Sequence, residues 1–119
     1  MAHLKFKAFM SCSFAEEDLQ IVEFFRSYCD SFGLEVLKYD FQEPLPLSDG
    51  VKKQIESADC LVAIATRRNR LESGEWVCSD WIQHEVVYAS AVGKSIVVLA
   101  EEGVRIGGLV ERAERCQPF

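Results

Sequence analysis

Two runs of consecutive apolar residues limit most strongly what this chain can fold into. Cys60–Ala65 reads C-L-V-A-I-A and Ser95–Ala100 reads S-I-V-V-L-A, without the polar alternation of a half-exposed strand. Such runs predict strands that are buried on both faces of a parallel sheet. Shorter strand-like segments lie at residues 6–12 and 34–39, and polar interruptions in the second of these favour a sheet edge.

Helical patterns separate these strands. Residues 15–32 repeat apolar side chains at three- and four-residue steps, begin with an acidic run and end before Gly33. Ser48 can cap a short second helix, and residues 79–93 carry a third apolar stripe. The alternation of strands and helices predicts an α/β fold, a flavodoxin-like doubly wound parallel sheet of four to five strands with helices on both faces.

The length of 119 residues predicts one domain, spanning 1–119, and a hydrophobic content of 49% can supply its core without metal or disulfides. The segment from about residue 101 is rich in glycine, and residues 109–115 could form a short helix. Little sequence is left there for a fifth strand. We therefore expect the C-terminal part to be incomplete.

Charge and composition exclude several classes of function. A net charge of −6 argues against a nucleic-acid-binding surface. No apolar run approaches the roughly 20 residues that span a bilayer, and no secretory signal is visible, so we expect a cytoplasmic protein without membrane contact. Five cysteines without a C-x-x-C pair, and only two histidines, predict neither disulfides nor a metal site.

Glu85 lies where a core residue is expected. It follows Trp81 by four residues and precedes Ala89 by four, in the middle of the third helix's apolar stripe. A carboxylate facing the interior costs several kcal/mol unless it is paired or neutralised. Either a neighbouring group satisfies Glu85, or it faces a cleft where the carboxylate is used. Ligands of doubly wound sheets bind outside the carboxyl ends of the strands, and Glu85 is expected near that edge.

Several segments, in order and spacing, resemble a TIR (Toll/interleukin-1 receptor) domain of the bacterial TIR-like NAD+-cleaving type. The matching segments are K-A-F-M-S-C-S-F-A-E-E-D at 7–18, G-L-E-V at 33–36, a proline-containing loop at 40–47, I-E-S-A-D-C-L-V-A-I at 55–64 and W-I-Q-H-E at 81–85. The last matches the W-x-x-x-E spacing that carries the catalytic glutamate of TIR enzymes. The arginine cluster at 67–70 is not a general feature of that family.

The resemblance implies an NAD+ glycohydrolase (NADase) that cleaves the nicotinamide–ribose bond in a defence or signalling role, with Glu85 as the catalytic residue. NAD+ would then be the substrate, and no cofactor is expected. Nicotinamide in NAD+ is already a cationic leaving group, so one carboxylate that stabilises an oxocarbenium-like ribose suffices.

Other side chains at the same edge are candidates for binding the nucleotide. Serine hydroxyls can hydrogen-bond ribose or phosphate, aromatic rings can lie beside a flat base, and guanidinium groups match phosphate oxygens. Tight-turn serines, core aromatics and solvated arginines are the structural alternatives. The expected binding residues are Ser11, Ser13, Phe14, Trp81, Arg67 and Arg68, with Arg70 as a further arginine of the same cluster.

Two other functions remain open. The first is a non-enzymatic TIR module that self-associates, or binds other TIR domains, through the loop at residues 40–50 with its Pro44 and Pro46. The second is a nucleoside deoxyribosyltransferase-like enzyme, which also uses a glutamate on a similar sheet. Release of nicotinamide would distinguish the enzyme from the module, and base exchange would identify the transferase.

Overall fold

The computed structural model describes residues 6–37, 45–105, 107 and 112–119. Its centre is a five-stranded sheet with the order β2-β1-β3-β6-β7, and all neighbouring strands pair in parallel. This confirms the α/β, flavodoxin-like fold predicted from the sequence. The elements of the main sheet and its helices are β1 (Lys7–Ser11), a short 3-10 helix η1 (Glu16–Asp18), α1 (Leu19–Ser31), β2 (Glu35–Leu37), α2 (Asp49–Ser57), β3 (Cys60–Ala65), α3 (Asp80–Ala91), β6 (Ser95–Ala100) and β7 (Arg115–Pro118).

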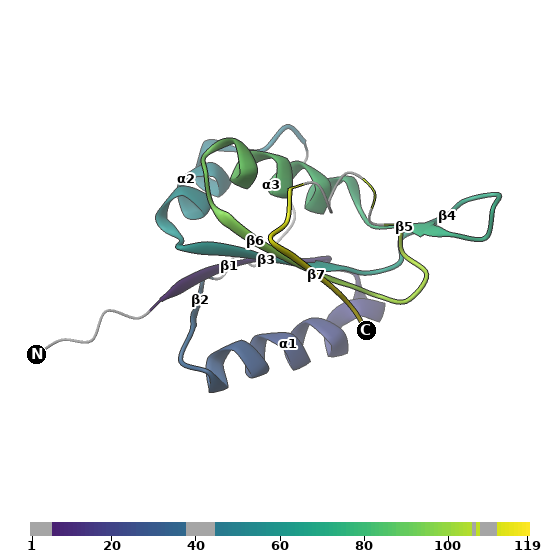
Figure 1. Ribbon diagram of the computed structural model, residues 1–119, viewed down its shortest axis with the longest axis horizontal. Coiled ribbons are helices and arrows are strands. Elements are labelled where there is room, and N and C mark those ends of the chain that lie inside the picture. The colour runs from purple at the N-terminus through teal and green to yellow at the C-terminus, as the bar shows by residue number, and fades with distance from the viewer. Residues whose placement is uncertain (1–5, 38–44, 106, 108–111) are drawn as a thin grey trace, which may run out of the picture.

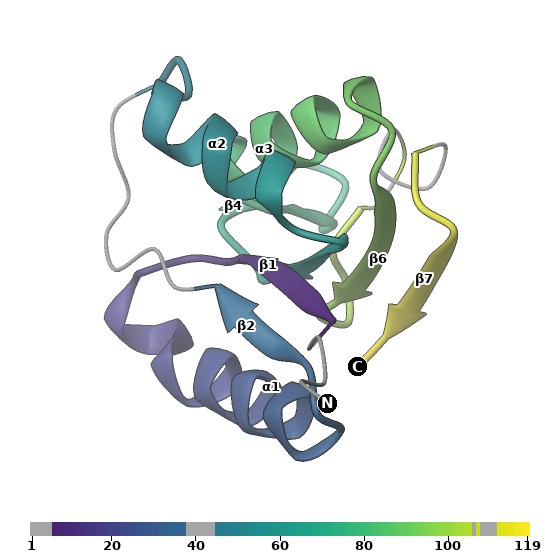
Figure 2. The ribbon, with the colours of Figure 1, turned by 90° about the vertical axis from the view of Figure 1, so that its left-hand side faces the viewer.

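Helices cover both faces of the sheet, as predicted. Figures 1 and 2 show α1 on one face and α2 with α3 on the other. The core between the sheet and α2 and α3 includes Phe9, Ile55 and Trp81. A second core lies under α1 and includes Val22 and Val62. The side chains of β1 alternate between the two cores, because successive residues of a strand point to opposite faces.

The helix ends follow the sequence signals. The side chains of Ser48 and Ser79 accept hydrogen bonds from the backbone N–H three residues later, so they cap α2 and α3. Gly33 and Gly93 adopt φ values of +81° and +78° just after α1 and α3. This left-handed conformation suits glycine and lets the chain turn back towards the sheet.

Three features differ from the expectations. A fifth strand, β7, forms at Arg115–Pro118 and pairs with β6, although the sequence left little room for it. The segment between β3 and α3 contains a small antiparallel hairpin of β4 (Asn69–Arg70) and β5 (Trp76–Val77). Finally, β6 alternates between buried and half-buried residues. Its Val97 and Leu99 are half-buried, so the prediction of a strand covered on both faces was wrong for β6.

The chain order creates a switch point between β1 and β3. From β1 the chain runs through α1 to β2 on one side, and from β2 it continues through α2 to β3 on the other. The connections that follow β1 and β3 run to opposite sides of the sheet. In folds of this kind, the loops at the carboxyl ends of two such strands diverge, and the crevice between them binds the ligand. Ser11 ends β1, and Thr66 follows the last residue of β3.

Some expectations fall on residues outside the description. These are residues 40–44 of the loop proposed for self-association and residues 109–111 of the short helix expected at 109–115. Among the described residues, no helix is both long and apolar enough to cross a membrane.

Candidate functional site

Glu85 lies in the second turn of α3 and points into the protein. Its residue is 1% exposed, and its helical neighbours Trp81, Val86 and Ala89 are buried with it. The apolar stripe predicted from the sequence is therefore the inward face of α3, and the carboxyl group belongs to that face. Such a placement is costly for an ionised group unless other groups compensate for it.

Ser11 is the direct partner of this carboxyl group. Phe9, two residues earlier in β1, faces the core below α2 and α3, and strand geometry places Ser11 on the same face. The Ser11 hydroxyl donates a hydrogen bond of 2.6 Å to Oε1 of Glu85, and both residues are buried. Within the described part of the chain, Oε2 of Glu85 has no hydrogen-bond partner. One oxygen is thus held, while the other is left for a further group.

Burial has the largest effect on the pKa of Glu85. It raises the pKa of the carboxyl group from 4.5 to about 8, although hydrogen bonding by the side chains of Ser11 and Trp81 lowers it. The contribution of Trp81 is weaker, because no hydrogen bond of ordinary geometry joins it to Glu85. No lysine or arginine forms an ion pair with Glu85 among the residues described. The carboxyl group is therefore mostly protonated at about pH 7.

A second polar cluster lies at the same edge. Asp18 and Thr66 are buried, and the Thr66 hydroxyl donates a 3.0 Å hydrogen bond to Oδ2 of Asp18. The guanidinium of Arg68 lies 3.8 Å from that same oxygen and donates a hydrogen bond to the hydroxyl of Ser13. The side chain of Arg68 is 32% exposed, so it links this buried cluster to solvent.

Cys12 lies between the two groups. Burial is the main cause that raises the pKa of its thiol to about 11; the charge of Arg26 lowers this pKa, and the charges of Glu85 and Asp18 raise it. The two carboxyl groups therefore act on the same short turn from Ser11 to Ser13. A thiol with so high a pKa is not a nucleophile at neutral pH, so Cys12 is not a reactive candidate on this turn.

The aromatic candidates lie in different cores. Trp81 is 2% exposed and belongs to the core that contains Glu85, one helical turn before it. Phe14 is half-buried and packs against the core under α1. The structure therefore brings Trp81, but not Phe14, into the same cluster as the carboxyl group.

The arginines of the 67–70 segment have separate partners. Nε of Arg67 donates a 2.8 Å hydrogen bond to the backbone oxygen of Glu102, and its backbone N–H donates to the carboxylate of Glu101. The guanidinium of Arg70 lies 5.9 Å from the ring centre of Trp76, as in a cation–π contact. Of the predicted arginines, only Arg68 contacts the turn that follows β1.

Sequence reasoning missed Asp18 and Thr66 as parts of the site. In the sequence, the acidic run at 16–18 indicates a helix start, where negative charge is favoured, and nothing local distinguishes the three acids. Only tertiary packing distinguishes Asp18 from Glu16 and Glu17, since Asp18 is buried and accepts a hydrogen bond from Thr66, 48 positions later. The position of Thr66 directly after a buried strand was the one signal available. Among the described residues, no group of three or more possible metal ligands is present.

Comparison with known proteins bears on the fold. No family model and no curated protein sequence matches this chain. The solved structure of Clostridium botulinum CMP N-glycosidase, BcmB, is similar to it with a TM-score of 0.65. The two sequences are 19% identical, and the match covers 95% of this chain and 88% of that one. At this identity the similarity establishes a shared α/β fold.

Proposed function

We propose that this chain cleaves the N-glycosidic bond of a nucleotide, with Glu85 as the catalytic carboxylate. The observation that carries the proposal is the buried carboxyl group of Glu85, which is 1% exposed. Its Oε1 accepts a hydrogen bond from Ser11, and its Oε2 has no hydrogen-bond partner among the described residues. Its position beside the end of β1, at the switch point of the sheet, is where ligands of this architecture bind.

The reaction needs a negative charge at the sugar. As the C1′–N bond breaks, the base leaves with both bonding electrons and the ribose becomes oxocarbenium-like. Oε2 of Glu85 would face C1′, either stabilising this cation or forming a transient ester with it. Water then supplies a hydroxyl group to C1′ and releases a proton to solvent. The products are the free base and the ribosyl moiety with a hydroxyl at C1′.

The environment of Glu85 favours a cationic partner. Burial that raises the pKa of Glu85 to about 8 also strengthens the attraction of its ionised carboxylate to any positive charge placed beside it. Because Glu85 is 1% exposed, a substrate must displace the side chains that cover it. Binding of a cationic ligand would thus both uncover the carboxyl group and favour its ionised form.

NAD+ is the first candidate substrate. Its nicotinamide is cationic and leaves as a neutral molecule, so no acid is required. The resemblance to TIR enzymes, with the W-x-x-x-E spacing of Trp81 and Glu85, supports the same choice. In this proposal Trp81 lies beside the reacting ring, and Arg68 with Ser13 binds phosphate. For Arg67 and Phe14, which have other contacts, the binding role stays a prediction.

A nucleoside 5′-monophosphate is the second candidate. The solved structure that is similar to this chain is a CMP N-glycosidase, and a phosphate would suit the half-exposed guanidinium of Arg68. A neutral base must gain a proton as it leaves. Glu85 is mostly protonated at about pH 7 and could supply that proton. The two substrates therefore need opposite ionisation states of Glu85.

The test is to incubate the protein with NAD+ and with a panel of nucleoside monophosphates, and to separate free bases by chromatography. We expect release of nicotinamide or of one nucleobase. Adding a different free base distinguishes hydrolysis from exchange, because a deoxyribosyltransferase-like enzyme would form a new nucleoside. If the concentrated protein releases no base from any substrate, the proposed activity is wrong and a non-enzymatic signalling module becomes the better explanation.

A further inference from the structure

The outer side of α1 carries a row of aromatic rings in mutual contact. The ring centres of Phe119 and Phe25 are 4.9 Å apart, and those of Phe25 and Phe24 are 5.2 Å apart. The row continues from Phe24 to Tyr28 at 6.3 Å and from Tyr28 to Phe32 at 4.9 Å. These five residues, here called the aromatic ladder, run from the C-terminal end of the described chain along the second half of α1 to Phe32, directly after the helix.

The ladder is exposed to a degree unusual for aromatic side chains. Phe24, Tyr28 and Phe32 are 63%, 55% and 69% exposed. With roughly 200 Å² for a whole aromatic side chain, these three rings expose on the order of 400 Å². An apolar patch of that size is comparable to the largest patch on a typical monomer, roughly 300 to 600 Å², which is often functional. Helical spacing places the uncharged Gln20, Ser27 and Ser31 on the same side.

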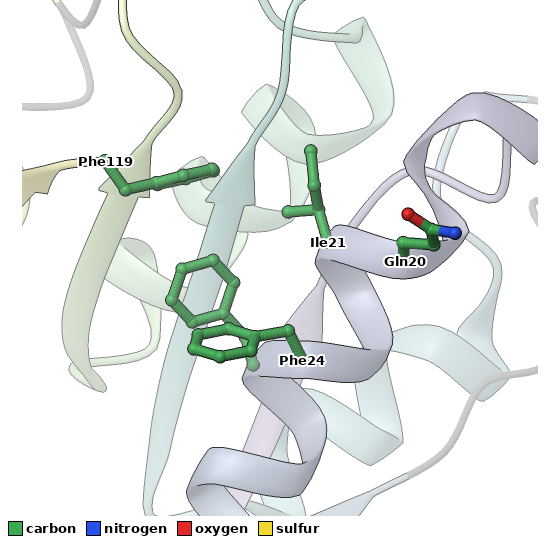
Figure 3. A pocket seen from close by; sticks show the side chains of 5 residues that line it. Gln20, Ile21, Phe24 and Phe119 are labelled. Atoms are coloured by element: carbon green, nitrogen blue, oxygen red, sulfur yellow. The ribbon is translucent and has the colours of Figure 1, made fainter.

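A groove adjoins the ladder. It has a volume of about 290 Å³ and is lined by Gln20, Ile21, Phe24, Phe25 and Phe119 (Figure 3). The neighbouring sheet surface is also incompletely covered, since Val97 and Leu99 of β6 are half-buried. Among the described elements, α1 is the one helix on this face, whereas α2 and α3 share the other (Figure 2). There is therefore room for another helix beside α1.

We infer that a second copy of this chain docks here, with the two α1 helices antiparallel about a two-fold axis. The groove lies beside the first half of α1, while Tyr28 and Phe32 project from its second half. An antiparallel arrangement places the projecting rings of each copy over the groove of the other. The surface is thus complementary to itself, which is what a two-fold interface requires.

The area is consistent with this arrangement. The exposed rings of two copies together supply on the order of 800 Å² of apolar surface to the interface. The grooves and a polar rim from Gln20, Ser27 and Ser31 add to this value. The total approaches the roughly 1,200 Å² at the lower end of specific protein–protein interfaces. We therefore expect a reversible dimer and not a permanent one.

Charge disfavours two other occupants. Glu16 and Glu17 precede the ladder, and Glu23 and Asp30 lie on α1 itself. The one basic residue of α1, Arg26, forms an ion pair of 2.8 Å with Glu23. Nucleic acids and anionic membranes bind surfaces that present unpaired Lys and Arg side chains. An acidic border around an apolar centre instead suits a protein surface.

The experiment measures molar mass by light scattering and by sedimentation velocity over a wide range of protein concentration. We expect the wild type to change from about 13.5 kDa towards twice that mass as its concentration rises. Tyr28→Glu should stay monomeric, because it places a charge in the apolar centre. Val87→Glu is the matched control, since Val87 is 46% exposed on α3, on the other face of the sheet, and should leave dimerisation unchanged.

A charge pair makes the test specific. Tyr28→Lys should also be monomeric alone, whereas an equimolar mixture of Tyr28→Lys and Gln20→Glu should form a heterodimer, because the antiparallel arrangement places residue 28 of one copy over the groove that Gln20 of the other copy lines. This rescue also shows that both variants are folded. The inference is overturned if the wild type is monomeric throughout, or if its dimer persists in Tyr28→Glu. Co-sedimentation of a monomeric wild type with anionic lipid vesicles would assign the ladder to a membrane surface instead.

Discussion

Ionisation of Glu85 opposes folding, because the folded protein binds its proton more tightly than the unfolded chain does. The pKa is about 8 in the folded state and 4.5 as the unperturbed value. The folded state therefore holds more protons between these values, so the free energy of unfolding falls as pH rises through this window. The stabilisation is fully present below about pH 4.5 and is lost above about pH 8.

Glu85→Gln should remove this pH dependence, because an amide stays neutral. The free energy of unfolding of the variant relative to the wild type should rise by roughly 4 to 5 kcal/mol across the window. Urea denaturation on either side of the window measures it. Glu72→Gln, on the exposed turn of the β4–β5 hairpin, is the matched control and should show no such change. An equal pH dependence of wild type and Glu85→Gln would contradict the burial of an ionisable carboxyl group at this position.

Ser11→Ala tests the proposed positioning role of Ser11. The hydrogen bond from Ser11 lowers the pKa of Glu85, so its loss should raise that pKa further above about 8. If the ionised carboxylate reacts, kcat/KM of the wild type rises with pH through this value, and the rise should move to higher pH in Ser11→Ala. Ser57→Ala, at an exposed serine of α2, should leave the profile unchanged. A pH profile identical in Ser11→Ala and wild type would mean that Ser11 does not act through Glu85.

At the scale of single residues, the sequence predicted that Glu85 lies among the apolar residues of α3, but it did not predict that Ser11 is its hydrogen-bond partner. An acid in an apolar stripe is visible from helical spacing alone. Ser11 was expected to contact ribose or phosphate, and the structure instead gives its hydroxyl to Glu85. Contacts between residues 74 positions apart depend on sheet register, which no local pattern contains.

At the scale of elements, α3 presents Glu85 and depends on its capped start. The hydroxyl of Ser79 accepts a hydrogen bond of 3.4 Å from the backbone N–H of Ile82. Ser79→Ala should reduce the free energy of unfolding by about 1 kcal/mol, because one N–H of the first turn loses its acceptor. Denaturant titration measures this change. Ser90→Ala, in the last turn of the same helix, should not destabilise the protein, since alanine has the higher helix propensity; a loss equal to that of Ser79→Ala would contradict the capping role.

Elements were more predictable than their surroundings. The apolar runs located β3 and β6, the cap at Ser48 located the start of α2, and the apolar stripe at 79–93 located α3. Burial of a strand depends on its spatial neighbours, and only packing reveals that α1 leaves part of β6 half-covered. The strand β7 escaped prediction because R-C-Q-P has weak strand propensity and is held by pairing with β6.

For the whole molecule, the topology places the proposed catalytic site and the proposed dimer interface in different parts of the fold. The switch point between β1 and β3 gathers Ser11, Glu85 and the Asp18 cluster at the carboxyl edge of the sheet. The aromatic ladder lies on the outer side of α1, away from the inward face that carries Val22 and Cys29. The proposed dimerisation and the proposed catalysis should therefore be separable by mutation, and Tyr28→Glu should leave the contacts of the Glu85 carboxyl group intact.

The most direct test of the central claim is the rate of base release by wild type, Glu85→Gln and the control Glu72→Gln, with the best substrate of the panel. We predict at least about a hundredfold loss in Glu85→Gln, because the charge that stabilises the ribosyl cation is gone, and no loss in Glu72→Gln. Circular dichroism would confirm that both variants are folded. A folded Glu85→Gln variant that releases base at the wild-type rate would contradict the assignment of Glu85 as the catalytic carboxylate.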